Sequence, residues 1–554
     1  MSTRRRRRYR HGLPLVVVAV AAFAVGAIVG GNSGPDVRGA VRAYANAWAR
    51  QDFGHMYSLL DRRSRRGLTQ AQFVSEYRAA AQTATLRSLR VRHVGSPNGR
   101  EVPVQMLAST AIFGTLRETL LVPYNVTGPA PRITFASTLL FPGLRPGEQL
   151  SRSVSLPPRA TLLARNGVPL AKGPDRISPI PSVASSIVGI LGPIPAAQTS
   201  HYALLGYPPD AKVGMNGLER VFQGQLAGRP GGTLRAGTRV LARTRPVRGK
   251  AVRTSIDPSL ETAAATALGS SYGGIAAMDP RTGQLLALAG LAFSILQPPG
   301  STMKVITTTG ALQAGIVKLT DSFPIATEAT IDGYTLHNAG GEACGGTLLN
   351  AFAVSCNSVF APLGVKLGAT RLVSTAERFG FNHRFYIPGA AESQIPSAKE
   401  IGGPLDVGVS AIGQGRVLAS PLEMTDVAAT IAMHGRRPLP TLRTDRPPRF
   451  VHVTSRRVAG LMQRLMVAVV EFGTGTAAQI PGVTVAGKTG TAEIGNSNNP
   501  TASNPQNTDA WFVGYAPVGA PRIVAGALFT AAGAGGATAA PAIRQVLEAG
   551  LSRH

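Results

Sequence analysis

Near its start the chain has an uncharged, apolar stretch of nineteen residues, from Leu13 to Gly31, with arginines at 4–8 and 10 before it. A run of this length can cross a hydrocarbon core ~30 Å thick, and the side with more positive charge stays inside. We therefore predict a basic cytoplasmic tail at residues 1–12 and a transmembrane signal anchor at residues 13–31. A cleaved signal peptide and a twin-arginine export signal are the alternatives, and both also carry the rest of the chain across a membrane.

After residue 35 the apolar positions follow a helical period, and a second helix is predicted to begin at Thr69, where Gln72 completes a capping box. The period then changes to two, which predicts four strands. The apolar positions of the first helix are Val37, Val41, Tyr44, Ala45 and Trp48, and the strand candidates lie at 89–93, 102–106, 115–124 and 132–141. This order predicts a small α+β domain at residues 35–145, with no catalytic pattern.

The region 150–250 is rich in Pro and Gly at its start and has little periodicity, which favours an elongated linking module. Beyond residue 252 a strand–turn–strand pattern surrounds Asp279–Gly283, and helical patterns occupy much of 301–435. Three further strands are predicted at Val483–Lys488, Trp511–Tyr515 and Ile523–Phe529. A last helix would carry Ile543, Val546, Leu547 and Leu551 on one face.

Composition supports a multidomain globular protein. The chain has 554 residues, 44% of them hydrophobic, and only two cysteines, which excludes a wholly disordered chain and a disulfide scaffold. Its 57 Lys and Arg against 28 Asp and Glu give a net charge of +29, which suits an anionic environment. We find neither zinc-finger spacing nor a basic stripe interleaved with aromatic residues, so we expect no nucleic acid partner.

Three short motifs carry the candidate chemistry: Ser301-Thr302-Met303-Lys304, Ser355-Cys356-Asn357 and Lys488-Thr489-Gly490. Ser301 would lie at a helix N-terminus, where free N–H groups favour an oxyanion, and Lys304 would share its face three residues on. A lysine can deprotonate a serine only if burial and neighbouring cations lower its pKa, and Lys488 could be such a cation. Each motif alone is also typical of a solvated pair, a turn or a strand end, so the inference depends on all three in this order.

Together the motifs resemble the signature of penicillin-binding transpeptidases and serine β-lactamases. The flanking residues resemble the penicillin-binding proteins more closely over about 252–550: PPGSTMK at 298–304, GVSAIGQGRVLASPLEMTD at 408–426, FGTG at 472–475, AGKTGTAE at 486–493 and AWFVGYAP at 510–517. Upstream, PRATLLARNGVPLA at 158–171 resembles the opening of the class B pedestal. Residues 35–145 are similar in pattern to the nuclear-transport-factor-like domain of the methicillin-resistance-type subgroup.

This resemblance implies a fold of several domains. They are the transmembrane helix, the small cone-like α+β domain at 35–145, an elongated pedestal or dimerisation domain at 150–250, and a transpeptidase domain at 252–550. The last would be a serine β-lactamase-like α/β domain, with a five-stranded antiparallel sheet flanked by helices.

The resemblance also implies the roles of individual residues. Ser301 would be the acylated nucleophile, Lys304 its general base, and Ser355 a proton relay towards the leaving amine. Lys488 would supply positive charge to the site. The substrate-binding residues would be Asn357 for an amide, Thr489 and Thr491 for the terminal carboxylate, and Gly490 for close approach of the strand to the substrate. Backbone N–H groups of Ser301 and Thr491 would form the oxyanion hole.

The implied reaction is D,D-transpeptidation of peptidoglycan stem peptides ending in D-Ala-D-Ala, and β-lactams would be trapped as acyl-enzymes. The resemblance implies no cofactor and no metal, and the histidines show no metal-ligand spacing. It places the chain in the bacterial plasma membrane, single-pass, with its N-terminus inside and its catalytic domain outside. Residues 35–250 have no Glu-Asp pair of the glycosyltransferase kind, so a membrane glycosyltransferase of the SEDS type is the expected partner.

Three other functions stay open at this point. A β-lactamase role would leave the residues upstream of the catalytic domain unexplained, and no Glu-x-x-x-Asn loop lies between the second and third motifs. A D,D-carboxypeptidase differs only in letting water resolve the ester. A non-turnover β-lactam or cell-wall sensor would need a longer inner segment than Met1 to Gly12.

Between the turn at Asp279–Gly283 and Ser301 the chain is shorter than is usual in the family. Cys344 and Cys356 are either a disulfide that pins the Ser355 loop or two buried thiols.

Overall fold

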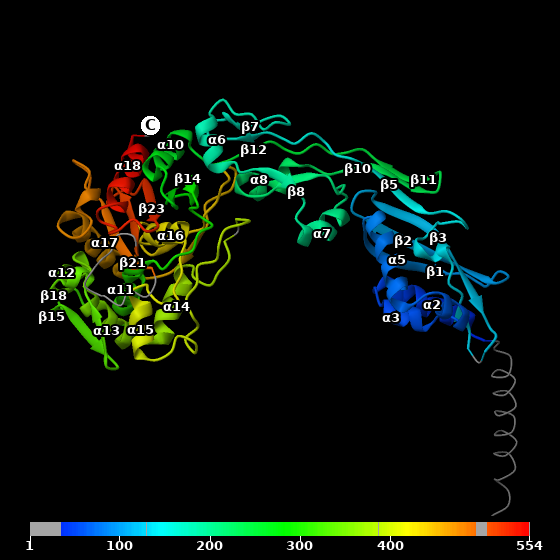
Figure 1. Cartoon of the computed structure of the whole chain (residues 1–554), viewed down its shortest axis with the longest axis horizontal. Coiled ribbons are helices and arrows are strands. Elements are labelled where there is room, and N and C mark those ends of the chain that lie inside the picture. Colours follow the sequence, from blue (N-terminus) through cyan, green and yellow to red (C-terminus); the bar gives the residue numbers. More distant parts are fainter. Residues whose placement is uncertain (1–34, 129, 386, 495–506, 553–554) are drawn as a thin grey trace, which may run out of the picture. The chain divides into compact units, whose positions relative to one another are not determined.

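The computed structural model describes residues 35–128, 130–385, 387–494 and 507–552, and the predicted tail and anchor at 1–31 lie outside these ranges. Within the described ranges, none of the helices combines the length and the apolarity needed to cross a membrane. The chain forms two compact units (Figure 1). The first extends to Pro157 and also takes in Pro193–Ala211 and Arg229–Val247. The second comprises Pro158–Gly192, Lys212–Gly228 and the chain from Arg248 onward.

The described part of the first unit begins with four helices, followed by an antiparallel sheet in the order β1-β2-β3-β4. Its elements are α2 (Val37–Ala49), α3 (Phe53–Ser58), α4 (Arg62–Gly67), α5 (Gln70–Thr83), β1 (Leu86–Val94), β2 (Glu101–Thr110), β3 (Thr115–Asn125) and β4 (Arg132–Ile133). The predicted apolar face of α2 is buried, and Thr69 and Gln72 form the capping box of α5, so both predictions are confirmed. The two short helices α3 and α4 were not predicted.

The fourth predicted strand, at 132–141, is wrong beyond its first two residues. β4 ends at Ile133, and a 3-10 turn forms at Ser137–Leu140. Ser64 Oγ accepts the Phe135 N–H at 2.8 Å, so a side chain takes a backbone group that a strand would pair with its neighbour. The Thr134 hydroxyl donates to Asp61 at 2.8 Å, which ties the same segment to the residue before α4. The alternating Leu139 and Phe141 are fully buried, so the period-two pattern here reflects burial and not a strand.

Three segments of the 150–250 region form a second antiparallel sheet within the first unit, in the order β11-β10-β5. They are β5 (Leu150–Ser155), β10 (Gly231–Ala236) and β11 (Arg239–Thr244). The short helix α7 (Thr199–Leu204) belongs to the same unit. The predicted domain boundaries remain a prediction.

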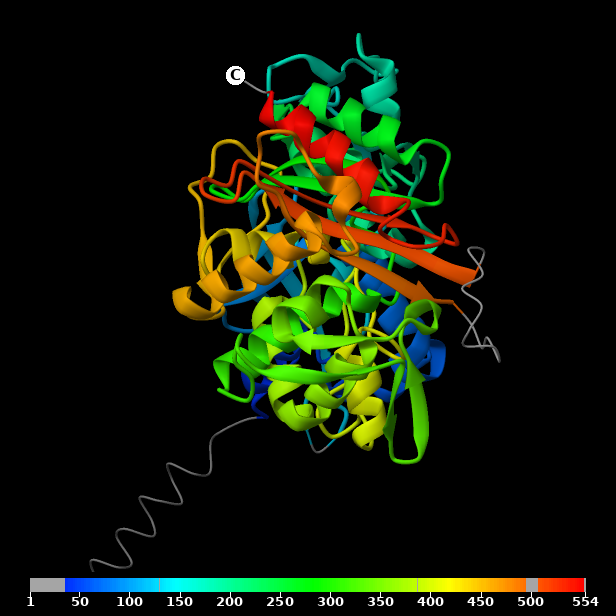
Figure 2. The same cartoon turned by 90° about the vertical axis from the view of Figure 1, so that its left-hand side faces the viewer.

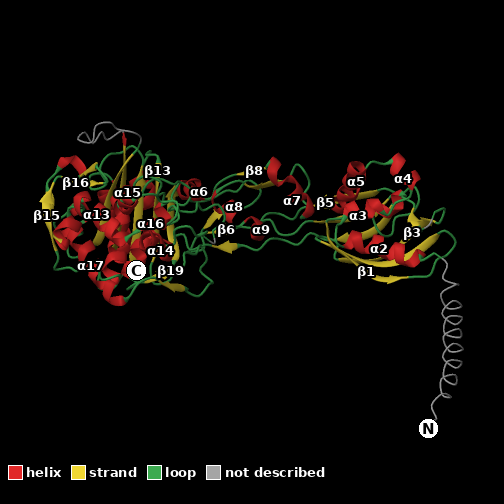
Figure 3. Ribbon diagram, turned by 90° about the horizontal axis from the view of Figure 1, so that it is seen from below, coloured by secondary structure: helices red, strands yellow, loops and turns green. Residues whose placement is uncertain are grey.

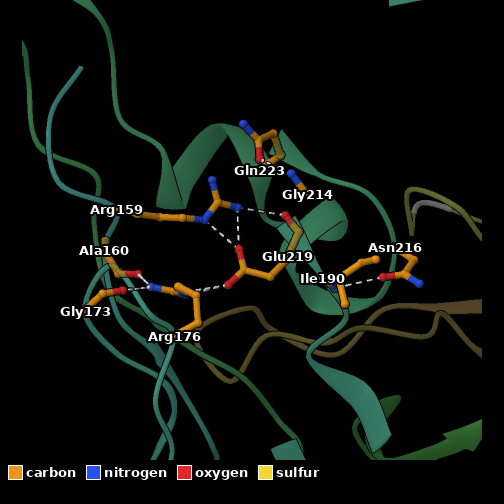
Figure 4. Close-up of polar contacts among 9 residues, drawn as sticks. All are labelled: Arg159, Ala160, Gly173, Arg176, Ile190, Gly214, Asn216, Glu219 and Gln223. Carbon is orange, nitrogen blue, oxygen red and sulfur yellow. Dashed lines mark hydrogen bonds and ion pairs between the residues drawn. The ribbon is translucent and has the colours of Figure 1, made fainter. Parts of the chain in front are cut away.

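The second unit begins with a set of short elements, and a buried carboxylate links some of them. They are β6 (Leu162–Leu163), β7 (Pro169–Ala171), α6 (Pro181–Ile187), β8 (Leu191–Pro193), β9 (Lys212–Gly214), α8 (Gly217–Val221), α9 (Gln223–Leu226) and β12 (Val252–Arg253). Glu219 on α8 is fully buried, and its two carboxylate oxygens accept from Arg159 Nε at 2.6 Å and Arg176 Nε at 2.7 Å (Figure 4). Arg176 also donates to the Ala160 carbonyl at 2.9 Å. The cluster therefore ties α8 to the residues around β6 and β7.

The rest of the second unit is built on the predicted five-stranded antiparallel sheet, in the order β14-β13-β23-β22-β21. Its strands are β13 (Gly273–Asp279), β14 (Gln284–Gly290), β21 (Ala486–Glu493), β22 (Thr508–Ala516) and β23 (Ile523–Phe529). Alternate residues of β13 belong to opposite cores. Ile275 and Ala277 pack with α10 (Pro258–Leu268) and α18 (Ala539–Leu551), whereas Ala276 and Met278 join the core of α16 (Pro421–Ala432). Helices therefore cover both faces of the sheet (Figure 2).

The helical region between β14 and β21 contains most of the remaining elements (Figure 3). Its helices are α11 (Lys304–Gln313), α12 (Leu348–Ala353), α13 (Asn357–Leu367), α14 (Ala369–Phe379), α15 (Pro404–Ala411) and α17 (Arg456–Glu471). It also has short strands that were not predicted: β15 (Ser322–Ala326), β16 (Glu328–Ile331), β17 (Tyr334–His337), β18 (Cys344–Thr347), β19 (Arg436–Pro438) and β20 (Phe450–His452).

One strand boundary needs correction, because β21 begins at Ala486 and not at Val483. Val483 instead closes a turn in which its N–H donates to the Ile480 carbonyl at 3.1 Å. The strand then runs through the third motif as far as Glu493, so Lys488, Thr489 and Gly490 lie in its middle and not at its end.

Candidate active site

Ser301 lies in a 3-10 turn, Gly300–Met303, immediately before α11, so the α-helix begins three residues later than the sequence predicts. The turn sits against β21. A Cβ added to Gly300 would lie 2.7 Å from the Thr491 carbonyl oxygen, and Gly300 has φ +51°. Glycine at this position therefore lets the turn that carries Ser301 approach the strand that carries the third motif.

Lys304 is the first residue of α11 and joins the first two motifs. Its Nζ lies 2.9 Å from Ser301 Oγ, 2.7 Å from the Ser355 carbonyl oxygen and 2.8 Å from Asn357 Oδ1. The predicted spacing of three residues thus brings the amine to the serine hydroxyl. Two further acceptors hold that amine in a defined position.

Burial lowers the pKa of Lys304 well below its ordinary value, and the nearby charge of Lys488 lowers it further. Lys304 has no exposed surface, and its Nζ lies 5.6 Å from the centre of the Phe360 ring. Among the described residues no carboxylate forms an ion pair with either lysine. A desolvated ammonium without a counterion favours the neutral amine, which is the form a general base needs.

Ser355 lies between α12 and α13 with φ +66°, a left-handed conformation that is uncommon for a residue with a side chain. Lys488 Nζ donates to Ser355 Oγ at 2.8 Å, and Lys304 Nζ lies 3.2 Å from the same oxygen. Burial lowers the pKa of Lys488 to about 7. Its Nζ is 5.6 Å from the centre of the Phe352 ring. One hydroxyl is therefore placed between the two lysines.

Asn357, the first residue of α13, lies between Lys304 and β17. Its Oδ1 accepts from Lys304, and its Nδ2 donates to the His337 carbonyl oxygen at 2.9 Å. Because both ends of the side-chain amide are engaged, its orientation is fixed.

The residues predicted to bind the carboxylate lie on β21, which is an edge strand of the sheet. Thr489 Oγ1 lies 2.5 Å from Thr474 Oγ1, and Thr491 Oγ1 accepts the Gly535 N–H at 3.3 Å. A Cβ added to Gly490 would lie 2.7 Å from the Pro299 carbonyl oxygen. Besides its predicted role towards the substrate, Gly490 lets the loop before Ser301 pack against β21, because that loop leaves no room for a side chain at this position.

Cys344 on β18 and Cys356 form a disulfide, with Cα atoms 5.8 Å apart. Cys356 separates Ser355 from Asn357, so the bond attaches the second motif to a neighbouring strand.

Several residues of the site were missed in the sequence. Thr474 lies within the FGTG segment, which the resemblance includes without a role. Phe352 and Phe360 form a T-shaped pair with ring centres 5.7 Å apart, and they have the pattern of ordinary helix core residues. His337 contributes only its carbonyl oxygen, for which a sequence carries no signal.

Three protein-family models match parts of this chain. Residues 273–548 match the model of the penicillin-binding protein transpeptidase domain, 159–254 the penicillin-binding protein dimerisation domain, and 37–148 the NTF2-like N-terminal transpeptidase domain. Peptidoglycan D,D-transpeptidase PbpA of Mycolicibacterium smegmatis is 33% identical over 374 residues, which cover 55% of this chain and 74% of the relative. The chain belongs to the class B penicillin-binding proteins.

Solved structures of penicillin-binding proteins share its fold. Penicillin-binding protein A of Mycobacterium tuberculosis, solved as an imipenem acyl-enzyme complex, is 27% identical with a TM-score of 0.57, covering 71% of this chain and 99% of that one. PBP2 of Pseudomonas aeruginosa, solved with WCK 5153, is 25% identical with a TM-score of 0.62, covering 73% of this chain and 97% of that one.

Proposed function

We propose that Ser301 is the nucleophile through which this penicillin-binding protein acts as a peptidoglycan D,D-transpeptidase and is acylated by β-lactams. One observation carries the proposal. The Lys304 amine is buried, has a lowered pKa and lies 2.9 Å from the Ser301 hydroxyl. A serine becomes an effective nucleophile when an adjacent base takes its proton, and Lys304 meets that requirement.

In the acylation half-reaction, neutral Lys304 takes the Ser301 proton while Oγ attacks the carbonyl carbon of the penultimate D-Ala. The backbone N–H groups of Ser301 and Thr491 stabilise the oxyanion. The tetrahedral intermediate then collapses, the C–N bond breaks, and the terminal D-Ala leaves as an amine after accepting a proton through Ser355. Lys488, 2.8 Å from the Ser355 hydroxyl, orients that hydroxyl.

In the second half-reaction, an amine from a neighbouring stem peptide attacks the ester carbonyl and gives a proton to neutral Lys304. The new amide bond forms, the ester C–O bond breaks, and Lys304 returns the proton to Ser301. Water attacking the same ester would give D,D-carboxypeptidase activity instead. Thr489 and Thr491 bind the terminal carboxylate, Asn357 binds a substrate amide, and the positive charge of Lys488 attracts the anionic end of the peptide.

The chain acts at the bacterial plasma membrane, with residues 13–31 as a single-pass anchor, the N-terminus inside and the catalytic unit outside. Support comes from the uncharged length of that segment and the arginines before it. The first described helix begins only a few residues later, and α2 and β1 carry exposed arginines at 38, 42, 90 and 92 that suit anionic headgroups.

Residues 35–250 have no Glu-Asp pair of the glycosyltransferase kind, which supports a separate enzyme for glycan polymerisation. A membrane glycosyltransferase of the SEDS type is the proposed partner.

The test is labelling of the full-length protein with a fluorescent penicillin, followed by intact mass spectrometry over hours. Wild type should carry one stable label and Ser301→Ala none. Ser294→Ala, which removes an exposed serine seven residues upstream, should label like wild type. Label on Ser301→Ala would refute the mechanism, and loss of label within seconds would indicate a β-lactamase.

A further inference from the structure

Thr474 lies in the loop after α17, and this loop is fastened to the end of α12. The Thr474 N–H donates to the Ala353 carbonyl oxygen at 3.0 Å, and the Gly475 N–H donates to Val469 at 2.9 Å. A Cβ added to Gly473 would lie 2.2 Å from the same Ala353 oxygen. Ala353 is two residues before Ser355, so the loop is held against the segment that carries the second motif.

The side chain of Thr474 joins that segment to the third motif. Thr474 Oγ1 lies 2.5 Å from Thr489 Oγ1 and 3.3 Å from the Ala353 carbonyl oxygen. Thr489 is buried, with 5% of its surface exposed, whereas Thr474 is exposed. Among the described residues, Thr474 is the polar partner of the Thr489 hydroxyl.

The protons on these two hydroxyls can be placed only one way before substrate binds if the Thr474 hydroxyl donates to Ala353. Each hydroxyl has one proton to donate, and the Ala353 carbonyl oxygen can only accept. When Thr474 donates to Ala353, Thr489 must donate to Thr474. The Thr489 proton then points at Thr474 Oγ1.

A carboxylate has only acceptor oxygens, so Thr489 can bind one only by donating its single proton to it. The contact with Thr474 then survives only if Thr474 turns its own proton from Ala353 to Thr489. That turn leaves no orphaned group, because the Ala353 oxygen keeps the Thr474 N–H. An unpaired buried group would otherwise oppose the change.

We infer that Thr474 is a positioning residue for the terminal carboxylate of the substrate, whose hydroxyl turns to Thr489 as Thr489 donates to that carboxylate. The inference rests on the proposed function of Thr489. Thr474 affects binding of the substrate carboxylate through Thr489 and does not touch the reacting atoms.

The test compares two acyl-D-alanyl thioesters that differ only in the leaving group, mercaptoacetate or mercaptoacetamide. Thr474→Val should raise KM for the carboxylate substrate about tenfold, the value of one hydrogen bond, with kcat within about twofold. The ratio of kcat/KM for the carboxylate thioester to kcat/KM for the amide thioester should fall by the same factor. Thr474→Ser, which keeps the hydroxyl, should restore both.

Thr476→Val is the matched control, because Thr476 is exposed two residues further on and its hydroxyl has no described partner. It should behave as wild type. An equal loss for both thioesters, or a failure of Thr474→Ser to restore the preference, would overturn the inference and make Thr474 a purely structural residue. Thermal unfolding of each full-length variant identifies misfolding.

The two proposals fail in different ways. If Ser301→Ala were still acylated, the proposed function would fail whatever Thr474 does. If Ser301→Ala were inert and Thr474→Val kept the wild-type carboxylate preference, only the role of Thr474 would be refuted.

Discussion

Lys488 and Ser355 are 133 residues apart in the chain and are joined by a 2.8 Å hydrogen bond. The Lys304 amine lies 3.2 Å from the same hydroxyl oxygen. The three motifs therefore meet at one oxygen atom. Burial lowers the pKa of Lys304, and the nearby charge of Lys488 lowers it further. A low local dielectric screens charge poorly, so burial strengthens the effect of the Lys488 charge.

Replacing Lys488 should change the pH dependence of acylation in a defined direction. Part of the lowering of the Lys304 pKa comes from the Lys488 charge, so Lys488→Gln should raise that pKa. Because the general base must be neutral, the acidic limb of the rate profile should move to higher pH. The measurement is the second-order rate of acylation by a fluorescent penicillin between pH 5 and 10.

Lys366→Gln, on the exposed surface of α13, is the control and should leave the limb in place. A limb that moves to lower pH in Lys488→Gln would contradict the assignment of Lys304 as the base.

The disulfide between Cys344 and Cys356 should stabilise the loop that carries Ser355. Cross-links that close a loop of about this length contribute ~3 kcal/mol to the free energy of unfolding. Cys344→Ser/Cys356→Ser should therefore unfold at lower urea concentration and acylate more slowly. A reducing agent should lower the stability of wild type towards that of the double variant and leave the variant unchanged. Equal sensitivity of both proteins to the reductant would contradict this.

Glu219 should be among the most sensitive positions of the second unit. It is buried between Arg159 and Arg176, and removing one partner of a buried ion pair leaves uncompensated charge, at a cost of about 3–5 kcal/mol. Glu219→Gln should lower the urea midpoint accordingly. Glu548→Gln breaks an exposed pair on α18 and should change the free energy of unfolding by less than ~1 kcal/mol. Similar effects of the two substitutions would refute the importance of burial here.

Glu423 on α16 should make the protein less stable as the pH rises. Burial raises its pKa from 4.5 to about 8, and nearby Arg437 offsets this only in part. The folded state therefore holds its proton over a pH range in which the unfolded state has lost it, so stability falls between these two values. Glu423→Gln does not titrate. It should gain on wild type by about 1.4 kcal/mol per pH unit across this window.

Urea unfolding at pH 5, 6, 7 and 8 measures the difference for Glu423→Gln. A gap that stays constant or narrows with rising pH would show that Glu423 is ionised in the folded protein.

The sequence predicts those parts of the fold that local chemistry determines. Thr69 and Gln72 predict the start of α5 because a capping box is complete within four residues. The spacing of Ser301 and Lys304 predicts their contact for the same reason. The strand predicted at 132–141 fails because Ser64, about seventy residues earlier, takes the Phe135 N–H, and no local pattern encodes that bond.

The same distinction applies within the site. The motifs identify the reacting groups. The residues that set the pKa values and the orientation of those groups lie elsewhere in the sequence, where nothing in the pattern marks them as part of the site. The Phe352 and Phe360 rings help to desolvate the two lysines, and the hydroxyl of Thr474 reaches Thr489 from another loop. A sequence can therefore identify the base before it can show why the pKa of its amine is lowered.

The division into two units has a consequence for any attempt to shorten the protein. The chain passes between them five times, near residues 157, 192, 211, 228 and 247. A fragment beginning at Pro158 would keep β10 and β11 but lose β5, along which β10 pairs from Gly231 to Ala236. Its new sheet edge would offer six unpaired residues to other molecules, a known route to aggregation. Neither unit can be excised with a single cut, so a shortened transpeptidase would need its crossing segments redesigned together.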